Sequence, residues 1–350
     1  MALAKDDRPP TGRKRLAGRR KGVTLTDVAR LARVSEITVS RILRNHGPAA
    51  KQTRERVMAV VRQVGYVPNR LAGGLASSGS MLVGVIVPSL TNVVFPEVLD
   101  GIRSGLEGTG FEAVIGVSDY NLKTEEGLVA SLLAWKPAAL VIAGYDHTAA
   151  ARALLLGSGV RIAEVMEIDI QPIDLAVGLS HRRAGFDTGQ YLLGRGYKRF
   201  GYVGHDWTSD RRARLRYEGL VAALVEADVE RPVVCRFEGP SSAGAGRNTL
   251  AQLLDQRRNF DVVVFSNDDM ATGGIFHCLG AGIRPKEDLA LFGFNGLDIG
   301  QALPTPLSTI RSNRFLIGKT AIERLLLQRN RPEAHEILDT GYQILTGATA

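Results

Sequence analysis

The side chains whose types and spacing could act together in this chain are mainly cations, and they gather at one end. Residues 1–80 contain 17 lysines and arginines against 5 aspartates and glutamates, whereas residues 81–350 contain 27 against 31. Lysine and arginine neutralise phosphates, so a basic segment joined to a mildly acidic body is typical of proteins that bind nucleic acid. A basic tail that only keeps the protein soluble is the alternative.

Patterns that would support catalysis are missing from the sequence. It contains no G-x-x-x-x-G-K-[ST] phosphate loop, no G-x-S-x-G elbow and no H-E-x-x-H metal motif. Its six histidines form no i, i+4 pair, and Cys235 and Cys278 lack metal-like or redox spacing. We therefore predict that the protein is not an enzyme, with no catalytic residue, no cofactor and no metal.

The sequence also predicts a cytoplasmic protein without a membrane partner. No apolar run approaches the roughly 18–20 residues that span a bilayer. The charged N-terminus is not followed by the apolar region of a secretory signal. Two thiols in 350 residues suggest a reducing compartment rather than a disulfide scaffold.

Residues 23–68 carry the pattern of three short helices. Thr24 followed by Asp27 resembles a capping box, and Ser35 can cap a second helix only two residues after the first one ends. Valines at helical spacing predict a third helix over 53–64. A tight join between two short helices, followed by a third, predicts a helix-turn-helix domain. A three-helix bundle that binds protein is the alternative.

The composition of the segments on either side of these helices predicts that neither forms a stable structure by itself. Residues 1–22 mix Lys, Arg, Pro and Gly, and we predict a basic disordered arm. Residues 69–79 read as a short helix with Gly73 and Gly74 in its middle. Each glycine costs a helix about 1 kcal/mol relative to alanine, and so short a helix is marginal even without them.

From residue 80 onward, apolar strands alternate with helical stretches. The strands fall into two sets: "LVGVIVP", "EAVIGVS", "AALVIAG" and "RIAEVM", then "LAVGLS", "RFGYVG", "VVCRFE", "VVVFSN" and "LALFGF". Helices are predicted over 95–107, 124–135, 148–156, 182–195, 212–226, 246–257 and 270–281. This alternation predicts parallel sheets of βαβ units, here two doubly wound lobes with a ligand at the carboxyl ends of the strands.

Two stretches of the head, "LTDVARLARVSEITVSRILRN" and "GYVPNRLAGGLASS", resemble the lactose-repressor (LacI) family of bacterial transcriptional regulators. The resemblance extends from residue 23 to the end of the chain. Phrases such as "VGVIVPSLTNVVFPEVLDGI" and "GFNGLDIGQALPTPLSTI" are most similar to the gluconate-operon repressors of that family. The resemblance to this family implies an α/β protein. It would have an N-terminal all-α helix-turn-helix domain plus hinge, then a two-lobed periplasmic-binding-protein-like body with doubly wound parallel sheets.

The resemblance also sets expected boundaries. A helix-turn-helix DNA-binding domain is expected at 23–68, a hinge at 69–79, and an effector-binding and dimerisation domain at 80–345. Lobe 1 is expected to comprise about 80–178 plus 308–337, and lobe 2 about 179–307 plus 338–345. The chain shows no leucine heptads near "YQILTGATA", so we expect a homodimer rather than a tetramer.

In the family, the recognition helix begins at the position of Ser35, and the hinge folds into a helix on the operator. Chemistry suggests that Arg41 contacts guanine, Ile37 a thymine methyl and Glu36 a cytosine amino group. Leu75 matches the family's leucine that enters the minor groove and kinks the duplex. Ala50 stands where relatives often have a serine that caps the third helix. The remaining predicted DNA-binding residues are Thr24, Ser40, Arg44, Asn45, Asn69, Arg70 and Ala72.

The effector-binding residues that the resemblance implies stand at or near strand ends. Arg214, in "RRARLRYEGL", matches a second-lobe arginine that grips effectors. Asn295 stands where relatives often have an aspartate, and the missing negative charge favours an anionic ligand. The full predicted set is Pro88, Ser89, Phe95, Glu167, Arg214, Asn267, Asp268, Asn295 and Arg314.

Arginines with neutral amides suit a polyhydroxy carboxylate, so we predict a gluconate-like sugar acid as the small-molecule effector. Gluconate, its 6-phosphate and other aldonates remain open. The resemblance implies a repressor that binds near-palindromic double-stranded operator DNA and is released when the effector closes the lobes. The alternatives are a sugar-acid-binding transport protein and a sugar-acid kinase or dehydrogenase with the same α/β body.

Overall fold

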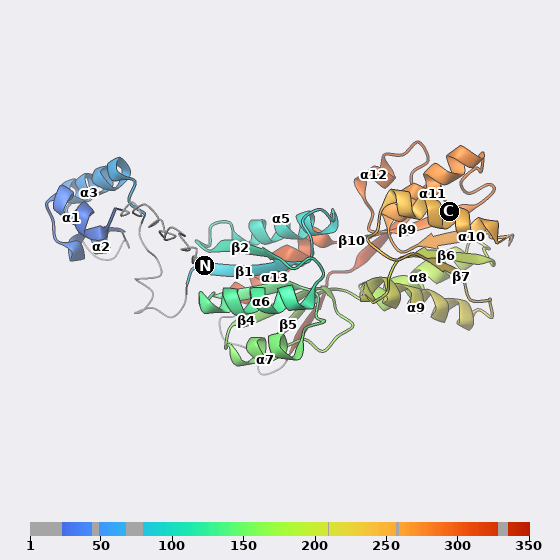
Figure 1. The fold of residues 1–350 in the computed structure, drawn as a ribbon, viewed down its shortest axis with the longest axis horizontal. Coiled ribbons are helices and arrows are strands. Elements are labelled where there is room, and N and C mark those ends of the chain that lie inside the picture. Colours follow the sequence, from blue (N-terminus) through green and yellow to red (C-terminus); the bar gives the residue numbers. More distant parts are fainter. Residues whose placement is uncertain (1–22, 44–48, 68–79, 209, 257–258, 328–334) are drawn as a thin grey trace, which may run out of the picture. The chain divides into compact units, whose positions relative to one another are not determined.

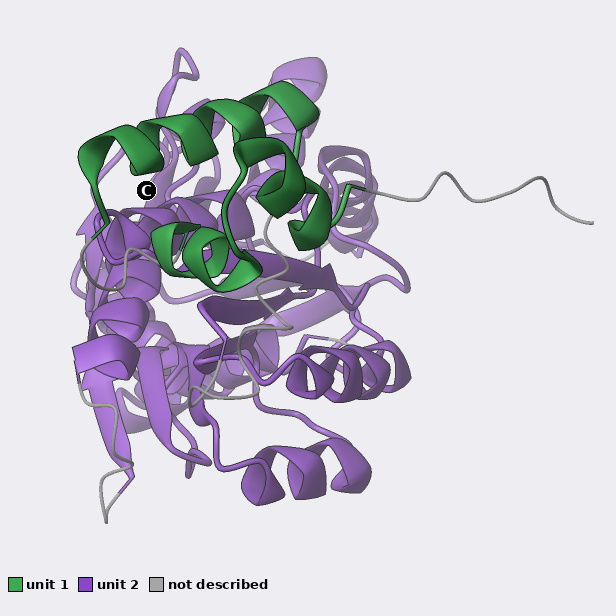
Figure 2. Ribbon diagram, turned by 90° about the vertical axis from the view of Figure 1, so that its left-hand side faces the viewer, with its two compact units in different colours: residues 1–77 green, residues 78–350 purple. Residues whose placement is uncertain are grey.

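The computed structural model describes residues 23–43, 49–67, 80–208, 210–256, 259–327 and 335–350. Its contacts divide the chain into two compact units, residues 1–77 and residues 78–350 (Figure 2). We call the described part of the first unit the head and that of the second unit the body. The predicted arm at 1–22 and the predicted hinge at 69–79 lie outside the described residues.

The head consists of three helices, α1 (Leu25–Ala32), α2 (Glu36–Leu43) and α3 (Lys51–Val64). Arg33 adopts a left-handed conformation (φ 54°) that turns the chain sharply between α1 and α2. The predicted helix-turn-helix is therefore present. The apolar faces of the helices meet in a small core of Val28, Ala29, Ala32, Val39, Ile42 and Val57.

The two helix starts that the sequence singled out differ. At α1, the capping box is formed, because Thr24 Oγ1 accepts from the Asp27 amide at 3.3 Å and Asp27 accepts from the Thr24 amide at 3.0 Å. Helix α3 begins at Lys51, two residues before the predicted start, although Ala50 makes no side-chain cap. An uncapped start leaves the first amides of α3 without the partner that a serine hydroxyl would supply.

The first lobe of the body is a parallel six-stranded sheet in the order β11-β5-β4-β3-β1-β2 (Figure 1). Its strands are β1 (Leu82–Val87), β2 (Glu112–Val117), β3 (Ala139–Ala143), β4 (Arg161–Glu167), β5 (Leu175–Leu179) and β11 (Glu336–Asp339). Its helices are α5 (Val94–Leu106), α6 (Leu122–Ala134), α7 (Ala149–Gly157) and α13 (Arg314–Leu327). Residues of β3, β4 and β5 are buried throughout, as expected for a parallel sheet with helices on both faces.

The second lobe has a sheet in the order β12-β10-β9-β8-β6-β7, in which only the β10–β12 pair is antiparallel. Its strands are β6 (Phe200–Gly204), β7 (Val233–Arg236), β8 (Val262–Phe265), β9 (Ala290–Phe294), β10 (Ser308–Ser312) and β12 (Tyr342–Leu345). Its helices are α8 (His181–Leu193), α9 (Arg211–Glu226), α10 (Ala243–Asp255), α11 (Asp268–Ala281) and α12 (Asp298–Gln301). Two doubly wound lobes are therefore confirmed.

Strand pairing corrects two of the predicted assignments. The strand in "LAVGLS", grouped with the second set, is β5 and pairs with β4 in the first sheet, in agreement with the expected boundary of lobe 1 at about residue 178. Residues 308–337 were expected in lobe 1, yet β10 pairs with β9 in the second sheet. The chain thus crosses between lobes after Leu179, Ser312 and Asp339. Both strands border a crossing, and the apolar pattern of a buried parallel strand does not encode which neighbour it pairs with.

Helix α9 lies close to α8 because each helix has a glycine that faces the backbone of the other. A Cβ on Gly185 would lie 1.9 Å from the carbonyl oxygen of Arg216, and a Cβ on Gly219 would lie 2.0 Å from that of Arg182. Any larger residue would push the helices apart. This close packing fixes the direction of α9, whose first six residues include four arginines.

Candidate functional sites

The side chains of helix α2 that are predicted to contact DNA bases are exposed to solvent. Ser35 caps the helix, because the Thr38 amide donates to Ser35 Oγ at 3.2 Å. Ile37 is 77% exposed. Such side chains are available to contact base edges in a major groove. The three side chains predicted to read bases are all exposed: Glu36, Ile37 and Arg41.

The other predicted DNA contacts have different placements. The hydroxyl of Thr24 donates to Asp27 at 2.7 Å, and these contacts hold the pKa of Asp27 below its usual value. Thr24 is thus engaged in capping α1. Ser40 is half-buried on α2. The remaining predicted contacts lie outside the described residues: Arg44, Asn45, Asn69, Arg70, Ala72 and Leu75.

A cleft in the body lies where the carboxyl ends of first-lobe strands meet the start of α9 from the second lobe. It holds about 570 Å³ of space not filled by protein atoms, part of which is open to solvent. Doubly wound folds bind ligands at these strand ends. The charged residues that line the cleft are Glu125, Asp146, Glu167, Asp210, Arg211 and Arg212.

Glu167, at the end of β4, joins the two lobes across this cleft. Its Oε1 accepts from Arg211 Nη1 at 3.1 Å, and the Arg211 guanidinium lies 4.2 Å from the ring centre of Tyr145 in the first lobe. Burial raises the pKa of Glu167 to about 8, although Arg212 opposes the shift. A protonated Glu167 still accepts from Arg211 through its carbonyl oxygen. The predicted acidic pocket position is therefore part of the cleft.

A buried histidine supports the first-lobe wall of the cleft. His147 Nδ1 lies 2.6 Å from Oε1 of Glu125, which lines the cleft, and His147 Nε2 lies 3.3 Å from Oε1 of Glu164. Burial alone would lower the pKa of His147, but its hydrogen bond to Glu125 and its close contact with Glu164 raise it to about 9. A protonated histidine here fixes the orientation of the Glu125 carboxylate.

The arginines of α9 face different surroundings, because successive helical residues are rotated by about 100°. Arg214, the predicted effector-binding arginine, points to solvent, where it lies 3.8 Å from Glu218. Arg216 points inward, donates to the Ser266 carbonyl at 2.8 Å and lies 3.1 Å from His181 Nδ1. The structure thus does not bring Arg214 to the cleft. Arg211 and Arg212 line it instead.

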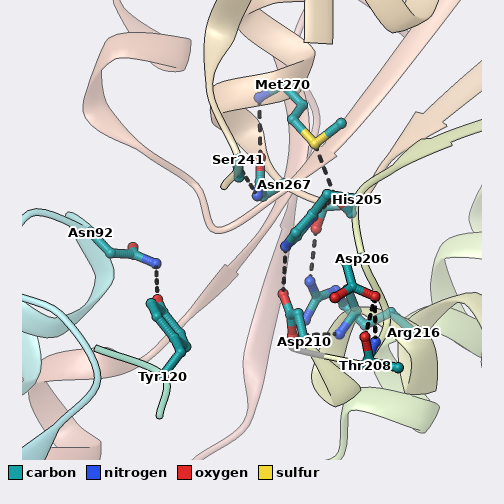
Figure 3. A network of polar contacts seen from close by, with 12 residues as sticks. Asn92, Tyr120, His205, Asp206, Thr208, Asp210, Arg216, Ser241, Asn267 and Met270 are labelled. Carbon is teal, nitrogen blue, oxygen red and sulfur yellow. Dashed lines mark hydrogen bonds and ion pairs between the residues drawn. The ribbon is translucent and has the colours of Figure 1, made fainter. Parts of the chain in front are cut away.

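Asn267 belongs to a polar network of the second lobe (Figure 3). Its Oδ1 caps α11 by accepting from the Met270 amide at 3.1 Å, and its Nδ2 donates to Ser241 at 2.7 Å. In the same network, His205 Nε2 lies 3.6 Å from Asp210, which lines the cleft. Figure 3 also shows Asn92 and Tyr120, which belong to the first lobe and lie apart from these second-lobe residues.

Asp268 is fully buried inside the second lobe and does not line the cleft. Its carboxyl accepts from the Thr309 hydroxyl at 2.6 Å and from the Leu297 amide at 2.7 Å, and burial raises its pKa to about 6. It ties α11 to β10 and to the loop after β9. The sequence placed it in the effector site because it follows a strand end.

The predicted first-lobe wall is only partly in the cleft. Pro88 lines it. The Ser89 hydroxyl is occupied by the turn that leads into α5, where it accepts from the Thr91 and Asn92 amides at 3.1 Å each. Phe95 is 1% exposed and belongs to the core.

Arg314 and Asn295 contact each other rather than the lining of the cleft. The Arg314 side chain is completely buried, and its guanidinium makes a fork on Glu97, with Nη2 2.8 Å from Oε1 and Nε 3.0 Å from Oε2. Its Nη1 donates to the carbonyl of Asn295, whose φ is 128°. Arg314 therefore links α5 of the first lobe to the end of β9 in the second.

The sequence did not single out several lining residues of the cleft. Tyr145 and Asp146 directly follow the stretch "AALVIAG"; Ser118 is the last residue of "EAVIGVS", and Tyr120 lies two residues further on. The rule that strand ends meet at one edge of a parallel sheet would have found them. Arg212 could have been found from its position in the first turn of α9.

Within the described parts of the chain, no helix is long and apolar enough to cross a membrane. Nor does any group of three or more His, Cys, Asp or Glu side chains there have the geometry to hold a metal ion.

Comparison with known proteins gives a consistent result along the whole chain. Residues 24–69 match the family described as bacterial regulatory proteins, lacI family, and residues 190–349 match the periplasmic binding protein-like domain. The HTH-type transcriptional regulator GntR of Pseudomonas aeruginosa is 36% identical over 99% of this chain and 98% of its own length. The regulator of the same name from Escherichia coli K12 is 30% identical over 95% and 99%.

Solved structures agree with these sequence matches. A LacI-family regulator from Silicibacter pomeroyi superimposes with a TM-score of 0.87 at 40% identity and covers 93% of this chain and 99% of that one. The lac repressor dimer bound to operator and the anti-inducer ONPF has a TM-score of 0.81 at 25% identity and covers 94% and 99%.

A helix-turn-helix head and a two-lobed body with a cleft at its strand ends together define a DNA-binding transcriptional regulator. The similar proteins are named as regulators and not as enzymes. The chain belongs to the LacI family of bacterial regulatory proteins.

Proposed function

We propose that this regulator is a cytoplasmic repressor that binds a near-palindromic operator as a homodimer and is released by a sugar acid, gluconate or a close relative. The observation that supports the proposal most is the cleft, in which arginines of the second lobe face carboxyl groups of the first. A ligand with one carboxylate and several hydroxyls can bond to both lobes at once.

Binding of this kind would favour one relative orientation of the lobes. A ligand shifts a conformational equilibrium only as far as it binds one state better, and contacts to both lobes supply that difference. The similar structure of the lac repressor is a dimer on its operator. In a dimer of this chain, a change in lobe orientation would alter the spacing of the two heads and weaken operator binding.

The proposal is tested by fluorescence anisotropy of the purified protein on fragments of its own upstream DNA, with and without excess gluconate. We expect tight, salt-sensitive binding that gluconate weakens, while the neutral polyol glucitol has no effect. Arg41→Ala is the control for the head and should weaken binding without changing the body. DNA binding that no sugar acid weakens would refute the effector, and absence of specific DNA binding at low salt would refute the repressor.

A further inference from the structure

The four arginines at the start of α9 differ in what they contact. Arg211 pairs with Glu167, Arg214 lies near Glu218 in solvent, and Arg216 is held by the Ser266 carbonyl and His181. Arg212 makes no hydrogen bond or ion pair with any residue that the structure describes, and its Nη1 is buried without a hydrogen-bond partner. A buried donor without a partner is unfavourable and rare in native proteins.

Arg212 also has the right position to meet a ligand. It lines the cleft, and its guanidinium carbon lies 5.8 Å from the ring centre of Phe95 in the first lobe. It stands in the first turn of α9, where the helix dipole adds positive potential. An anion in the cleft would therefore meet a half-buried arginine whose Nη1 is buried and has no other hydrogen-bond partner.

We infer that Arg212 binds the carboxylate of the effector, and that the cleft selects a monoanionic aldonate over the same acid carrying a 6-phosphate. This inference rests on the proposed function. A guanidinium offers two parallel N–H groups that match one carboxylate. A phosphate at the other end of the sugar would need a second set of donors, and Arg211, the other cation that lines the cleft, already donates to Glu167 at 3.1 Å.

The carboxyl groups of the cleft support the same selection. Glu125, Asp146, Glu167 and Asp210 line the space around the two arginines. Carboxyl oxygens accept hydrogen bonds from sugar hydroxyls, and those that are ionised repel a dianion at close range. Arg216 and Arg212 hold the pKa of Asp210 below its usual value against the effect of burial, so this group stays ionised. A ligand with one negative charge and many hydroxyls fits this lining, and a phosphorylated one does not.

The test is calorimetric titration of the full-length protein with gluconate, 6-phosphogluconate and glucitol. We expect Arg212→Gln to weaken gluconate binding by about 10- to 100-fold, the effect of losing a charge-assisted hydrogen bond. Arg214→Gln, two residues away on the solvent face, is the matched control and should change binding less than about 2-fold. Arg212→Lys keeps the charge without the fork and should fall between them. Operator binding without effector and thermal unfolding establish that each variant is folded.

The outcomes separate this inference from the proposed function. The inference predicts that the wild-type protein binds 6-phosphogluconate at least about 10-fold more weakly than gluconate. It is overturned if Arg212→Gln binds gluconate as tightly as the wild type, if 6-phosphogluconate binds as tightly as gluconate or more tightly, or if glucitol binds as well as gluconate. In the first two cases the proposed function stands. If the wild-type protein binds no sugar acid at all, the proposed function fails, and the inference with it.

Discussion

The head and the body of this regulator use charged side chains in opposite ways. In the head, the residues predicted to read bases are exposed. No charged side chain among the described residues of the head is buried. In the body, charged side chains such as Arg161, Glu164 and Arg314 are buried and paired. Exposed charges are screened by salt and buried pairs much less so. DNA binding should therefore depend steeply on salt, and ligand binding only weakly.

The largest effect that distinguishes the two regions is expected from Val39→Asp. Val39 is completely buried in the small core of the head, and an unpaired carboxylate there should destabilise it by about 3 kcal/mol or more. Operator binding should be lost, while the unfolding transition of the body and gluconate binding stay unchanged. Circular dichroism on heating and calorimetry measure both. Ile37→Asp, exposed on the same helix, is the control for folding of the head. Retained operator binding by Val39→Asp would refute this account.

In the body, Glu97→Gln should have the next largest effect. It leaves the buried guanidinium of Arg314 without its charged partner, and Glu97 is itself 44% exposed, so we expect a loss of about 1.5–3 kcal/mol of unfolding free energy. Asp100→Asn removes an exposed ion pair on the same helix and should cost less than about 1 kcal/mol. Urea unfolding compares the two. Equal effects would mean that the buried pair contributes no more than a surface pair.

The pH dependence of stability tests the buried Glu167. Its pKa is raised to about 8 in the folded protein, so the folded state holds more protons than the unfolded state between about pH 5 and 8. Unfolding free energy should therefore fall as the pH rises through this window, by at most about 1.4 kcal/mol per unit from this residue. Glu167→Gln should make the slope shallower between pH 6.5 and 8. An unchanged slope in the variant would show that Glu167 is already ionised at neutral pH.

The smallest expected effect is a gain of stability in the head. Ala50 precedes α3 without a side-chain cap, and Ala50→Ser should stabilise the head by about 0.5–1 kcal/mol. Thr24→Ala removes the capping box of α1 and should cost a similar amount or slightly more. Thermal unfolding of the head reports both changes. If Ala50→Ser gives no gain, the start of α3 is already satisfied by other partners.

Much of the fold could be predicted from the sequence because its signals are local. The cap at Thr24, the turn before Ser35 and the valines of α3 lie within a few residues of the structures they specify. The alternation of strands and helices likewise predicted two doubly wound lobes. The lobe predicted for β10 and the grouping of β5 with the second set of strands were wrong, because strand pairing depends on residues far away in the chain.

The site was harder to predict, for reasons that particular residues show. On α9, a shift of two residues separates Arg214 in solvent from Arg212 in the cleft, so a motif match gives the helix but not the side chain that faces inward. Arg314 is paired with Glu97, 217 residues before it in the chain, and no pattern in either segment indicates the other. Asp268 follows a strand end as ligand-binding residues do, yet it bonds to Thr309 inside the lobe.

The central claim is that the cleft of the body and the DNA-binding surface of the head are thermodynamically coupled. The most direct measurement is the affinity of gluconate for the protein alone and for the protein saturated with operator. Thermodynamic linkage requires that gluconate and operator weaken each other's binding by the same factor. If gluconate lowers the affinity for operator by a given factor, the operator complex should bind gluconate more weakly by that factor. Equal gluconate affinity in both states would contradict the account, because a ligand without preference between two states cannot shift them.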